Sequence, residues 1–396
     1  MAKEKIILDI QYLLMAKTGI RTYIQELLAA TELSKKYEYV LYPKLVHIEK
    51  NNLFKKHTKW RHLFFHLHTL FWKQLVIPLL ILWHRPKAVI FPDFHAPFWN
   101  LPCEKIIVFH DAFFWENPHN YNKWWLKYYL WSIIEGLNGK SKIISTSLAT
   151  EKKIIPLLKP KFIQTIYQSA PQFGKLTDAE PYEKLDCQPY ILHVGVLEKR
   201  KNLGVLVKGF ALFLETFPDY NLVLAGQKGP AKELDDYENL QILIHQLELK
   251  ANVFFTGYAS ANQLKWLYEN ASLYAFPSVK EGFGIPVLEA FSYNLPIIVS
   301  ENEAINEIAG NGALSVPSLD PQAWSEAMKK LINSSNYRND LIKNGKLRLK
   351  EFSKFVHPKL LALTGSEDEI NQVMKLFKVY GQKSKEANAD KNNYLM

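Results

Sequence analysis

Short apolar runs rich in β-branched residues alternate with helical patterns along the chain, and each run has the length of a buried strand. In the first half these runs are Ile6–Asp9, Tyr39–Tyr42, Ala88–Phe91, Ile106–Phe109, Ile143–Ser145 and Ile163–Ile166. In the second half they are Tyr190–Val194, Leu222–Ala225, Val253–Thr256, Leu273–Phe276, Ile297–Val299 and Ala313–Val316. Buried strands that alternate with helices form parallel sheets, so the two sets predict an α/β protein of two doubly wound, Rossmann-like domains.

Length and proline spacing suggest how these domains divide the chain. A length of 396 residues exceeds one typical core. The prolines Pro171, Pro181 and Pro189 mark a polar segment without periodicity, which we interpret as a linker. The expected divisions are a first Rossmann-like domain (1–170), a linker (171–189), a second Rossmann-like domain (190–355), a helical segment packing back on the first domain (356–382) and a polar tail (383–396).

Glycines and polar residues gather where the predicted strands end. His110 and Asp111 follow one strand of the first half, and Gly195 begins a polar segment after the first strand of the second half. Ligands of open parallel sheets bind outside the carboxyl ends of the strands. Two domains with these edges facing each other would enclose a cleft, with the linker as a hinge.

The segment Glu281-Gly-Phe-Gly-Ile-Pro-Val-Leu-Glu289 carries the most specific chemistry. Gly282 and Gly284 permit a tight loop, and Pro286 fits the first turn of a helix. A helix that opens after a glycine-rich loop binds anions, and the two flanking carboxylates can accept sugar hydroxyls. A nucleotide-sugar site fits this combination. The alternative is a strand–loop–helix junction whose glycines only make the turn.

Composition indicates an ordinary globular protein, with 48% hydrophobic and 22% charged residues. The two cysteines, Cys103 and Cys187, lack metal-ligand spacing and favour a reduced cytoplasmic compartment. The N-terminus lacks the apolar core of a signal peptide. Because the longest apolar run, Leu75–Trp83, is too short to cross a bilayer, we expect no membrane span.

The net positive charge of the chain comes entirely from its first half. Residues 1–175 hold 25 Lys and Arg against 12 Asp and Glu, and no acidic residue lies between Glu49 and Asp93. Basic and aromatic residues are interleaved there: Lys55, Lys56, Lys59, Arg61, Lys73, Arg85 and Lys87 with Trp60, Phe64, Phe65, Phe71, Trp72 and Trp83. This pattern favours an anionic membrane surface. The alternatives are a solvated helix with its aromatics in the core and, without any supporting motif, nucleic acid; we expect no nucleic-acid partner.

Two segments resemble the retaining glycosyltransferases of family four, which have the GT-B fold of two facing Rossmann-like domains. They are Leu192-His-Val-Gly-Val-Leu-Glu-Lys-Arg-Lys-Asn-Leu203 and the loop Phe276–Ala290, with its Glu-x7-Glu pattern. Weaker matches in the first half are Val108–Ala112, Thr18–Ile20 and Ile144–Ser147. The motif context is that of mannosyltransferase-like enzymes of bacterial surface polysaccharides.

The resemblance implies roles for individual residues. Arg200 and Lys201 would neutralise the donor diphosphate and act in catalysis with Glu281, which would accept hydrogen bonds from the donor sugar. Val196 stands where many relatives carry a further Arg. The other expected donor contacts come from glycines, backbone amides, the ribose-binding Glu289 and a residue beside the base: Gly19, Gly195, Gly282, Phe283, Gly284, Ile285, Glu289 and Tyr258.

First-domain residues would meet the transferred sugar and the acceptor. His110 resembles the family's catalytic His, whose expected role is a hydrogen bond to the sugar or the reacting centre; its alternative is a satisfied histidine at a strand end. Arg21, Asp93, His95 and Asp111 are the acceptor candidates. His62, His66 and His68 have no companion Cys or carboxylate, so we expect no metal site.

The implied reaction transfers a hexosyl unit, with mannose favoured, from a nucleotide-diphosphate sugar to a lipid-linked or polysaccharide acceptor in cell-surface glycan synthesis. Retention of configuration by front-face attack, without metal or cofactor, is what the resemblance implies. We expect a cytoplasmic enzyme on the inner face of the plasma membrane. The alternatives are a catalytically silent membrane-binding or partner-binding module and another sugar-nucleotide enzyme such as an epimerase. An NAD-binding oxidoreductase would need a Gly-x-Gly-x-x-Gly pattern, whereas the first loop holds only Gly19.

Overall fold

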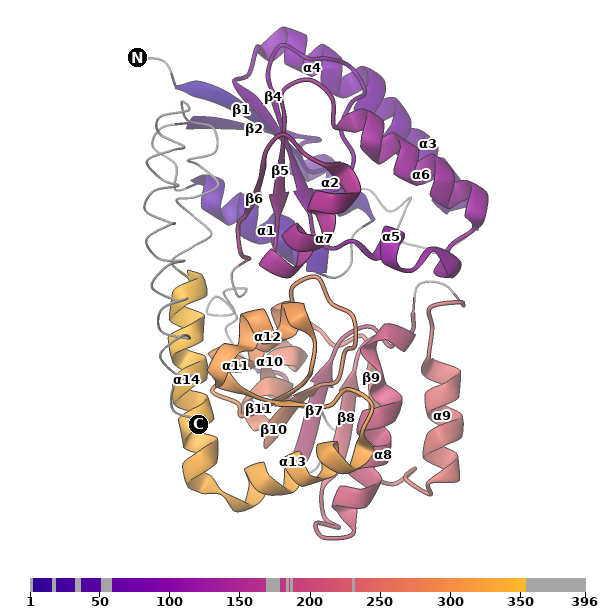
Figure 1. Ribbon diagram of the computed structural model, residues 1–396, viewed down its shortest axis with the longest axis vertical. Coiled ribbons are helices and arrows are strands. Elements are labelled where there is room, and N and C mark those ends of the chain that lie inside the picture. The colour runs from indigo at the N-terminus through magenta and orange to yellow at the C-terminus, as the bar shows by residue number, and fades with distance from the viewer. Residues whose placement is uncertain are drawn as a thin grey trace.

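The computed structural model describes residues 3–15, 19–32, 37–50, 59–168, 179–182, 185, 188–229 and 232–353. They form two six-stranded sheets in two lobes stacked along the long axis of the molecule (Figure 1). The strands pair in parallel throughout both sheets. The predicted fold class is therefore confirmed, and each predicted apolar run is a strand.

The first sheet has the order β2-β1-β3-β4-β5-β6. Its strands are β1 (Glu4–Asp9), β2 (Tyr37–Tyr42), β3 (Ala88–Phe91), β4 (Glu104–Phe109), β5 (Ser141–Ser145) and β6 (Ile163–Thr165). Its helices are η1 (Gln11–Leu14), α1 (Gly19–Glu32), α2 (Leu45–Lys50), α3 (Lys59–Phe71), the π-helix η2 (Trp72–Val76), α4 (Ile77–His84), α5 (Phe113–Glu116), η3 (Pro118–Asn120), α6 (Lys123–Gly136) and α7 (Leu148–Leu158).

The second sheet has the order β12-β11-β10-β7-β8-β9. Its strands are β7 (Tyr190–Val194), β8 (Asn221–Ala225), β9 (Val253–Gly257), β10 (Leu273–Phe276), β11 (Ile297–Ser300) and β12 (Ala313–Val316). Its helices are η5 (Lys199–Lys201), α8 (Leu203–Leu214), α9 (Tyr237–Gln246), α10 (Ala261–Asn270), α11 (Ile285–Ser292), α12 (Glu303–Ala309), η6 (Gly310–Gly312), α13 (Pro321–Asn333) and α14 (Ser335–Ser353).

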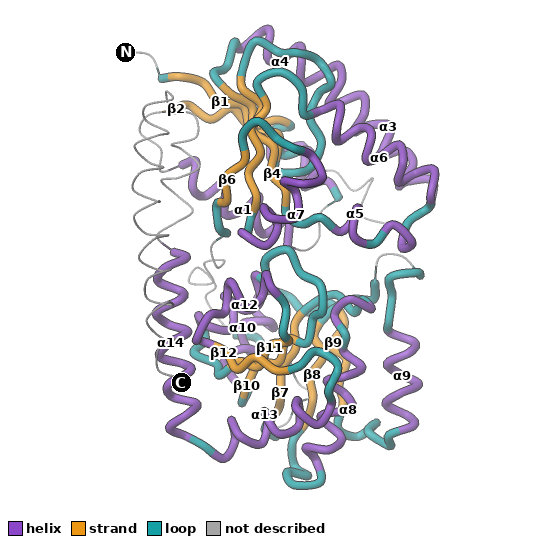
Figure 2. The backbone as a smooth tube through the Cα atoms, in the orientation of Figure 1, coloured by secondary structure: helices purple, strands orange, loops and turns teal. Residues whose placement is uncertain are grey.

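Alternation along the strands gives each sheet two buried faces. In β1, Ile6 and Leu8 pack with Ile24 of α1, whereas Ile7 packs with Ile81 of α4 on the opposite face. In β7, the neighbours Ile191 and Leu192 likewise belong to different clusters, one packed on α8 and α13 and the other on α10, α11 and α12. The strands (orange in Figure 2) therefore lie between helical layers, which explains why they read as continuous apolar runs.

Several predicted segments lie outside the described residues. Of the expected linker, the structure describes only 179–182, 185 and 188–189. The expected helical segment (356–382), the polar tail (383–396), Thr18 and Cys187 are also outside the description.

Candidate active site

Three of the predicted donor residues, Arg200, Lys201 and Glu281, meet at the switch point of the second sheet. There β7 lies between β8, which follows it in the chain, and β10, which is reached by crossing the sheet. The crevice at such a reversal of strand order is where open α/β sheets bind ligands. Lys199–Lys201 come from the segment after β7, and Glu281–Glu289 follow β10. The strand order thus brings together two motifs separated by about 80 residues of chain.

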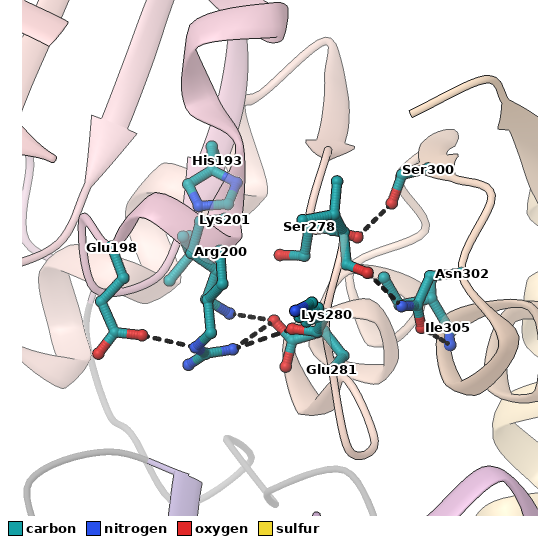
Figure 3. A network of polar contacts seen from close by, with 12 residues as sticks. His193, Glu198, Arg200, Lys201, Ser278, Lys280, Glu281, Ser300, Asn302 and Ile305 are labelled. Carbon is teal, nitrogen blue, oxygen red and sulfur yellow. Dashed lines mark hydrogen bonds and ion pairs between the residues drawn. The ribbon is translucent and has the colours of Figure 1, made fainter. Parts of the chain in front are cut away.

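A carboxylate between two cations forms the centre of this site (Figure 3). Glu281 Oε1 lies 2.5 Å from Lys201 Nζ and 3.0 Å from Arg200 Nη1. Arg200 also donates from Nε to Glu198 Oε2 at 2.6 Å, which fixes the plane of its guanidinium. Lys201 is buried and Glu281 is largely buried, so both are shielded from bulk water. With Glu198 the cluster holds two cations and two carboxylates, and Arg200 and Lys201 are the groups in it that can bind an anionic ligand.

The pKa values in this cluster are shifted by two opposing effects, burial and the charges of neighbouring side chains. Burial alone would raise the pKa of Glu281, but the charges of Lys201 and Arg200 outweigh burial and lower that pKa to about 2. Burial lowers the pKa of Lys201, and the Glu281 charge opposes that effect. Burial also acts to lower the pKa of Arg200, but Glu281 and Glu198 raise it overall. Glu281 is therefore ionised throughout the neutral range and cannot act there as a general acid.

The loop after β10 is fastened on both sides. Val279 N donates to the Arg200 carbonyl at 3.0 Å, which ties it to the cationic segment. On the other side, Asn302 Nδ2 donates to the Val279 carbonyl at 2.8 Å, and Ser300 Oγ donates to the Ser278 carbonyl at 2.5 Å (Figure 3). The position of Glu281 is therefore held by the backbone rather than by its ion pairs alone.

The two loop glycines serve different purposes. Gly284 has φ of 101°, a left-handed conformation that favours glycine, and caps α11, whose first turn contains Pro286 as predicted. Gly282 faces the first lobe, where an added Cβ would lie 1.9 Å from the His110 carbonyl oxygen. Ser147 Oγ of the first lobe donates to the Gly282 carbonyl at 2.6 Å. Gly282 thus permits the close approach of the two lobes.

His110 lies at the carboxyl end of β4, buried against the second lobe. Its Nε2 is 2.8 Å from the Pro92 carbonyl, which only accepts, so Nε2 carries a proton. Burial lowers the pKa of His110 to about 4, although the Pro92 carbonyl and Asp93 oppose the shift. The ring is therefore neutral near pH 7, and Nδ1, 3.4 Å from Gln168 Nε2, is its acceptor atom. The structure places His110 beside Gly282 of the Glu281–Glu289 loop.

Asp111 and Glu289 flank this centre as carboxylates with raised pKa values. Burial raises the pKa of Asp111 to about 6, against the opposing effects of the Phe113 amide and Arg200. Burial raises the pKa of Glu289 to about 7, and the Tyr268 hydroxyl, which donates to it at 2.7 Å, opposes the shift. Unlike Glu281, Glu289 therefore titrates near neutral pH.

The acceptor candidates Asp93 and His95 are held within the first lobe. Asp93 and Asp9 pair with Lys73 Nζ at 2.8 and 2.9 Å, and all three are buried at the switch point between β1 and β3. His95 Nε2 lies 3.0 Å from Ser132 Oγ, and burial lowers the pKa of His95 to about 3. Both candidates therefore support the architecture of the first lobe.

Three further residues of the predicted site, Gly19, Arg21 and Tyr258, lie on other elements of the fold. Gly19 begins α1 and faces the second lobe, since an added Cβ would lie 3.9 Å from Ile285 Cδ1. Arg21, also on α1, is exposed and donates to the Leu13 carbonyl at 3.4 Å. Tyr258 follows the edge strand β9 and is 73% exposed, and β8 lies between β9 and β7.

The remaining predicted donor residues lie around the cation cluster. Gly195 is beside Lys201, since an added Cβ would lie 3.5 Å from Lys201 Cε. Phe283 is buried and packs edge-on against Phe352 in the second-lobe core, which leaves its amide, rather than its ring, for the predicted role. The structure therefore places Gly195 and Glu281 next to Arg200 and Lys201.

Two residues of interest were missed or misplaced by sequence reasoning. Lys73 was assigned to a basic surface stretch, but it is buried in the ion triad with Asp9 and Asp93, so that assignment is wrong for this residue. His193 of β7 is fully buried; its Nδ1 is 3.0 Å from the Ala275 carbonyl, while Nε2 has no hydrogen-bond partner. A polar residue inside an otherwise apolar strand was the available signal for His193.

Comparisons with known proteins agree with this geometry. The profile of the family described as "Glycosyl transferases group 1" matches residues 175–348. The chain is 26% identical over 272 residues to O-antigen chain mannosyltransferase B of Escherichia coli, covering 66% of this chain and 70% of that protein. It is 33% identical over 159 residues to O-antigen chain mannosyltransferase RfbU of Salmonella typhimurium, covering 40% and 43%. The crystal structure of WaaG, a glycosyltransferase involved in lipopolysaccharide biosynthesis, superposes with a TM-score of 0.62 at 15% identity, covering 90% of this chain and 98% of that one.

The two lobes have the GT-B arrangement of two parallel-sheet α/β domains, as in WaaG. The match to the group 1 glycosyltransferase family covers residues 175–348, which contain both sequence motifs, and it confirms the resemblance that these motifs carry. A catalytically silent module or an epimerase is not favoured.

Proposed function

We propose that the protein transfers a hexosyl unit, with mannose as the favoured sugar, from a nucleotide-diphosphate sugar to a lipid-linked or polysaccharide acceptor. The observation that carries the proposal is the pairing of Arg200 and Lys201 with Glu281 at the β7–β10 switch point. The mannosyltransferase relatives support the choice of sugar and the role in surface glycan synthesis.

In the proposed reaction the donor diphosphate binds Arg200 and Lys201 and displaces Glu281 from one of its two ion pairs with them. Arg200 and Lys201 then neutralise the negative charge that grows on the departing diphosphate as the glycosidic bond breaks. Glu281, freed from one of its ion pairs, accepts hydrogen bonds from hydroxyls of the transferred sugar. The start of α11, with its amides at Phe283, Gly284 and Ile285, adds dipole stabilisation for the phosphates.

The first lobe completes the site in this proposal. His110 is neutral, so it serves as a hydrogen-bonding group through Nδ1 rather than as a positive charge. Retention of configuration is proposed from the motif resemblance, with attack from the face the diphosphate leaves and the phosphate oxygen taking the acceptor proton. Neutralisation by Arg200 and Lys201 replaces a divalent metal in this scheme. We further propose action at the cytoplasmic face of the plasma membrane, where an anionic lipid surface would be a partner.

The test is turnover of a panel of UDP-, GDP-, dTDP- and ADP-sugars by the full chain in the presence of EDTA. We expect one mannose-carrying donor to be turned over selectively, and the anomeric proton of the product to show retained configuration by NMR. Loss of turnover in EDTA with recovery on adding Mg²⁺ or Mn²⁺ would overturn metal independence. An absence of turnover with every donor by folded protein would overturn the proposed donor class.

A further inference from the structure

One long helix on the first lobe has two contrasting faces. The helices α3, η2 and α4 run without a break, and Phe64–His84 is a 21-residue stretch long and apolar enough to cross a membrane, the one such stretch among the described residues. It is longer than the apolar run Leu75–Trp83, on which the expectation of no membrane span rests. Length and composition alone therefore leave open whether this helix spans a bilayer or lies on its surface.

The inner face of the helix is anchored in the fold. Phe65, Ile77 and Ile81 are buried, the last two in the core against β1, β3 and β4. Lys73, within the π-helical turn, pairs with Asp9 and Asp93 at the ends of β1 and β3. Spanning a membrane would require pulling this lysine from its two carboxylates into hydrocarbon, which is strongly unfavourable.

The outer face is apolar and exposed. Six apolar residues, spaced mostly three or four positions apart, are each 50% to 84% exposed: Leu67, Phe71, Leu75, Leu79, Leu82 and Trp83. The adjacent helix α6 adds Trp124, Tyr128, Trp131 and Ile134, each at least 42% exposed. Contact between the His66 and Trp125 rings, with centroids 5.9 Å apart, joins α3 to α6, and the two helices run side by side (Figure 1). We call these ten residues the lipid face.

The charged residues around the lipid face indicate the kind of surface that it contacts. No acidic residue lies between Glu49 and Asp93, and Asp93 is buried, so the described surface of Phe64–His84 carries no carboxylate. On α6 one carboxylate, Glu135, is exposed beside Ile134. Arg85, Lys123 and Lys127 are exposed on the same two helices or at their ends. Leucines lie along the middle, with Trp83, Trp124 and Trp131 among the flanking aromatics, and this distribution is typical of helices lying in a membrane interface.

We propose that the lipid face lies in the plane of an anionic membrane, with the helix parallel to the surface. This membrane proposal rests on the proposed function, because a membrane-bound enzyme would meet a lipid-linked acceptor at the bilayer surface. Lys73 on the inner face pairs with Asp93, and the neighbouring Pro92 carbonyl accepts the hydrogen bond of His110. The membrane-facing helix is thus connected through two contacts to the predicted acceptor side of the active site.

The test is sedimentation of the full chain with vesicles of phosphatidylglycerol and phosphatidylcholine, compared with phosphatidylcholine alone. We expect binding to the anionic vesicles at low salt, release by high salt or carbonate, and a loss of about tenfold or more in the Leu75→Glu/Leu79→Glu variant. The matched control is Ile242→Glu/Leu319→Glu, which alters two exposed apolar residues of the second lobe and should bind like the wild type.

Four outcomes would overturn the proposal. They are no binding at low salt, equal binding by the lipid-face variant, retention of the protein on vesicles after carbonate, and a dimer that the lipid-face variant abolishes. The third would indicate a spanning helix and the fourth a second copy of the chain as occupant. Circular dichroism confirms that each variant is folded, and donor hydrolysis in vesicle-free buffer should be unchanged. Failure of docking is thereby distinguished from failure of the proposed reaction.

Discussion

The carbonyl oxygen of His110 in the first lobe lies against Gly282 in the donor loop of the second, so closely that an added Cβ would come within 1.9 Å of it. Gly282 is therefore needed for the contact between the lobes as well as for the loop turn. Neither the sequence motif nor a single isolated lobe would reveal this requirement.

Gly282→Ala should keep both lobes folded but hold them apart. The added methyl would meet backbone rather than a flexible side chain, so the lobes must separate. Since displacing reacting groups by about 1 Å costs on the order of 100-fold in rate, we expect a loss of that size in kcat/KM. Gly204→Ala, whose Cβ would lie 3.7 Å from Leu243 Cδ2 in ordinary contact, is the control. Near-normal kcat/KM for Gly282→Ala would show that this approach is not needed for catalysis.

Glu289 should make donor binding depend on pH. Its pKa of about 7 means that it is increasingly protonated below neutrality and loses acceptor capacity for ribose hydroxyls. We expect the donor KM to rise by about tenfold between pH 8 and pH 6. In Glu289→Gln the KM should be high and nearly constant over that range. A wild-type profile in the Gln variant would assign the titration to another group, such as Asp111.

Glu307 should hold the lobes together. From α12 its carboxylate accepts hydrogen bonds from the amides of Leu148 and Ala149, at 2.7 and 2.9 Å, at the start of α7 in the other lobe. Capping of this kind contributes about 1–2 kcal/mol, so Glu307→Ala should shift the population towards open forms. Small-angle X-ray scattering should show a larger radius of gyration. Glu303→Ala removes the exposed pair with Lys152 and should leave the radius unchanged; equal radii for Glu307→Ala and wild type would contradict the capping role.

Lys73 should be a major contributor to folding stability. Lys73→Met leaves Asp9 and Asp93 buried without their cation, which we expect to cost about 3–5 kcal/mol in the free energy of unfolding. Lys87→Met removes the more exposed pair with Glu4 and should cost less than about 1 kcal/mol. Urea denaturation measures both. Equal, small losses would mean that Lys73 is not essential to the first lobe, and adding Asp9→Asn to Lys73→Met should recover part of the loss.

The strands and the donor motifs were predictable because both depend on local patterns. Buried parallel strands are apolar on both faces, so a continuous apolar run such as Tyr190–Val194 predicts a strand. Strand order then brings Arg200 and Lys201 to Glu281 without further information. The burial of Lys73 was not predictable, because it depends on two carboxylates, Asp9 and Asp93, from distant strands.

The Phe64–His84 helix was ambiguous for a related reason. Apolar residues cover both its buried and its exposed face, so hydrophobic periodicity does not distinguish the two faces.

The most direct test of the donor site is calorimetric titration of the wild type and variants with the nucleotide sugar that the enzyme turns over. Lys201→Met and Glu281→Gln alter the central ion pair, and Lys208→Met alters an exposed lysine on α8 as a control. We predict that Lys201→Met weakens binding by about tenfold to 100-fold through loss of a buried charge contact to the diphosphate, while Lys208→Met binds normally. Wild-type affinity in Lys201→Met would contradict a donor site at the β7–β10 switch point.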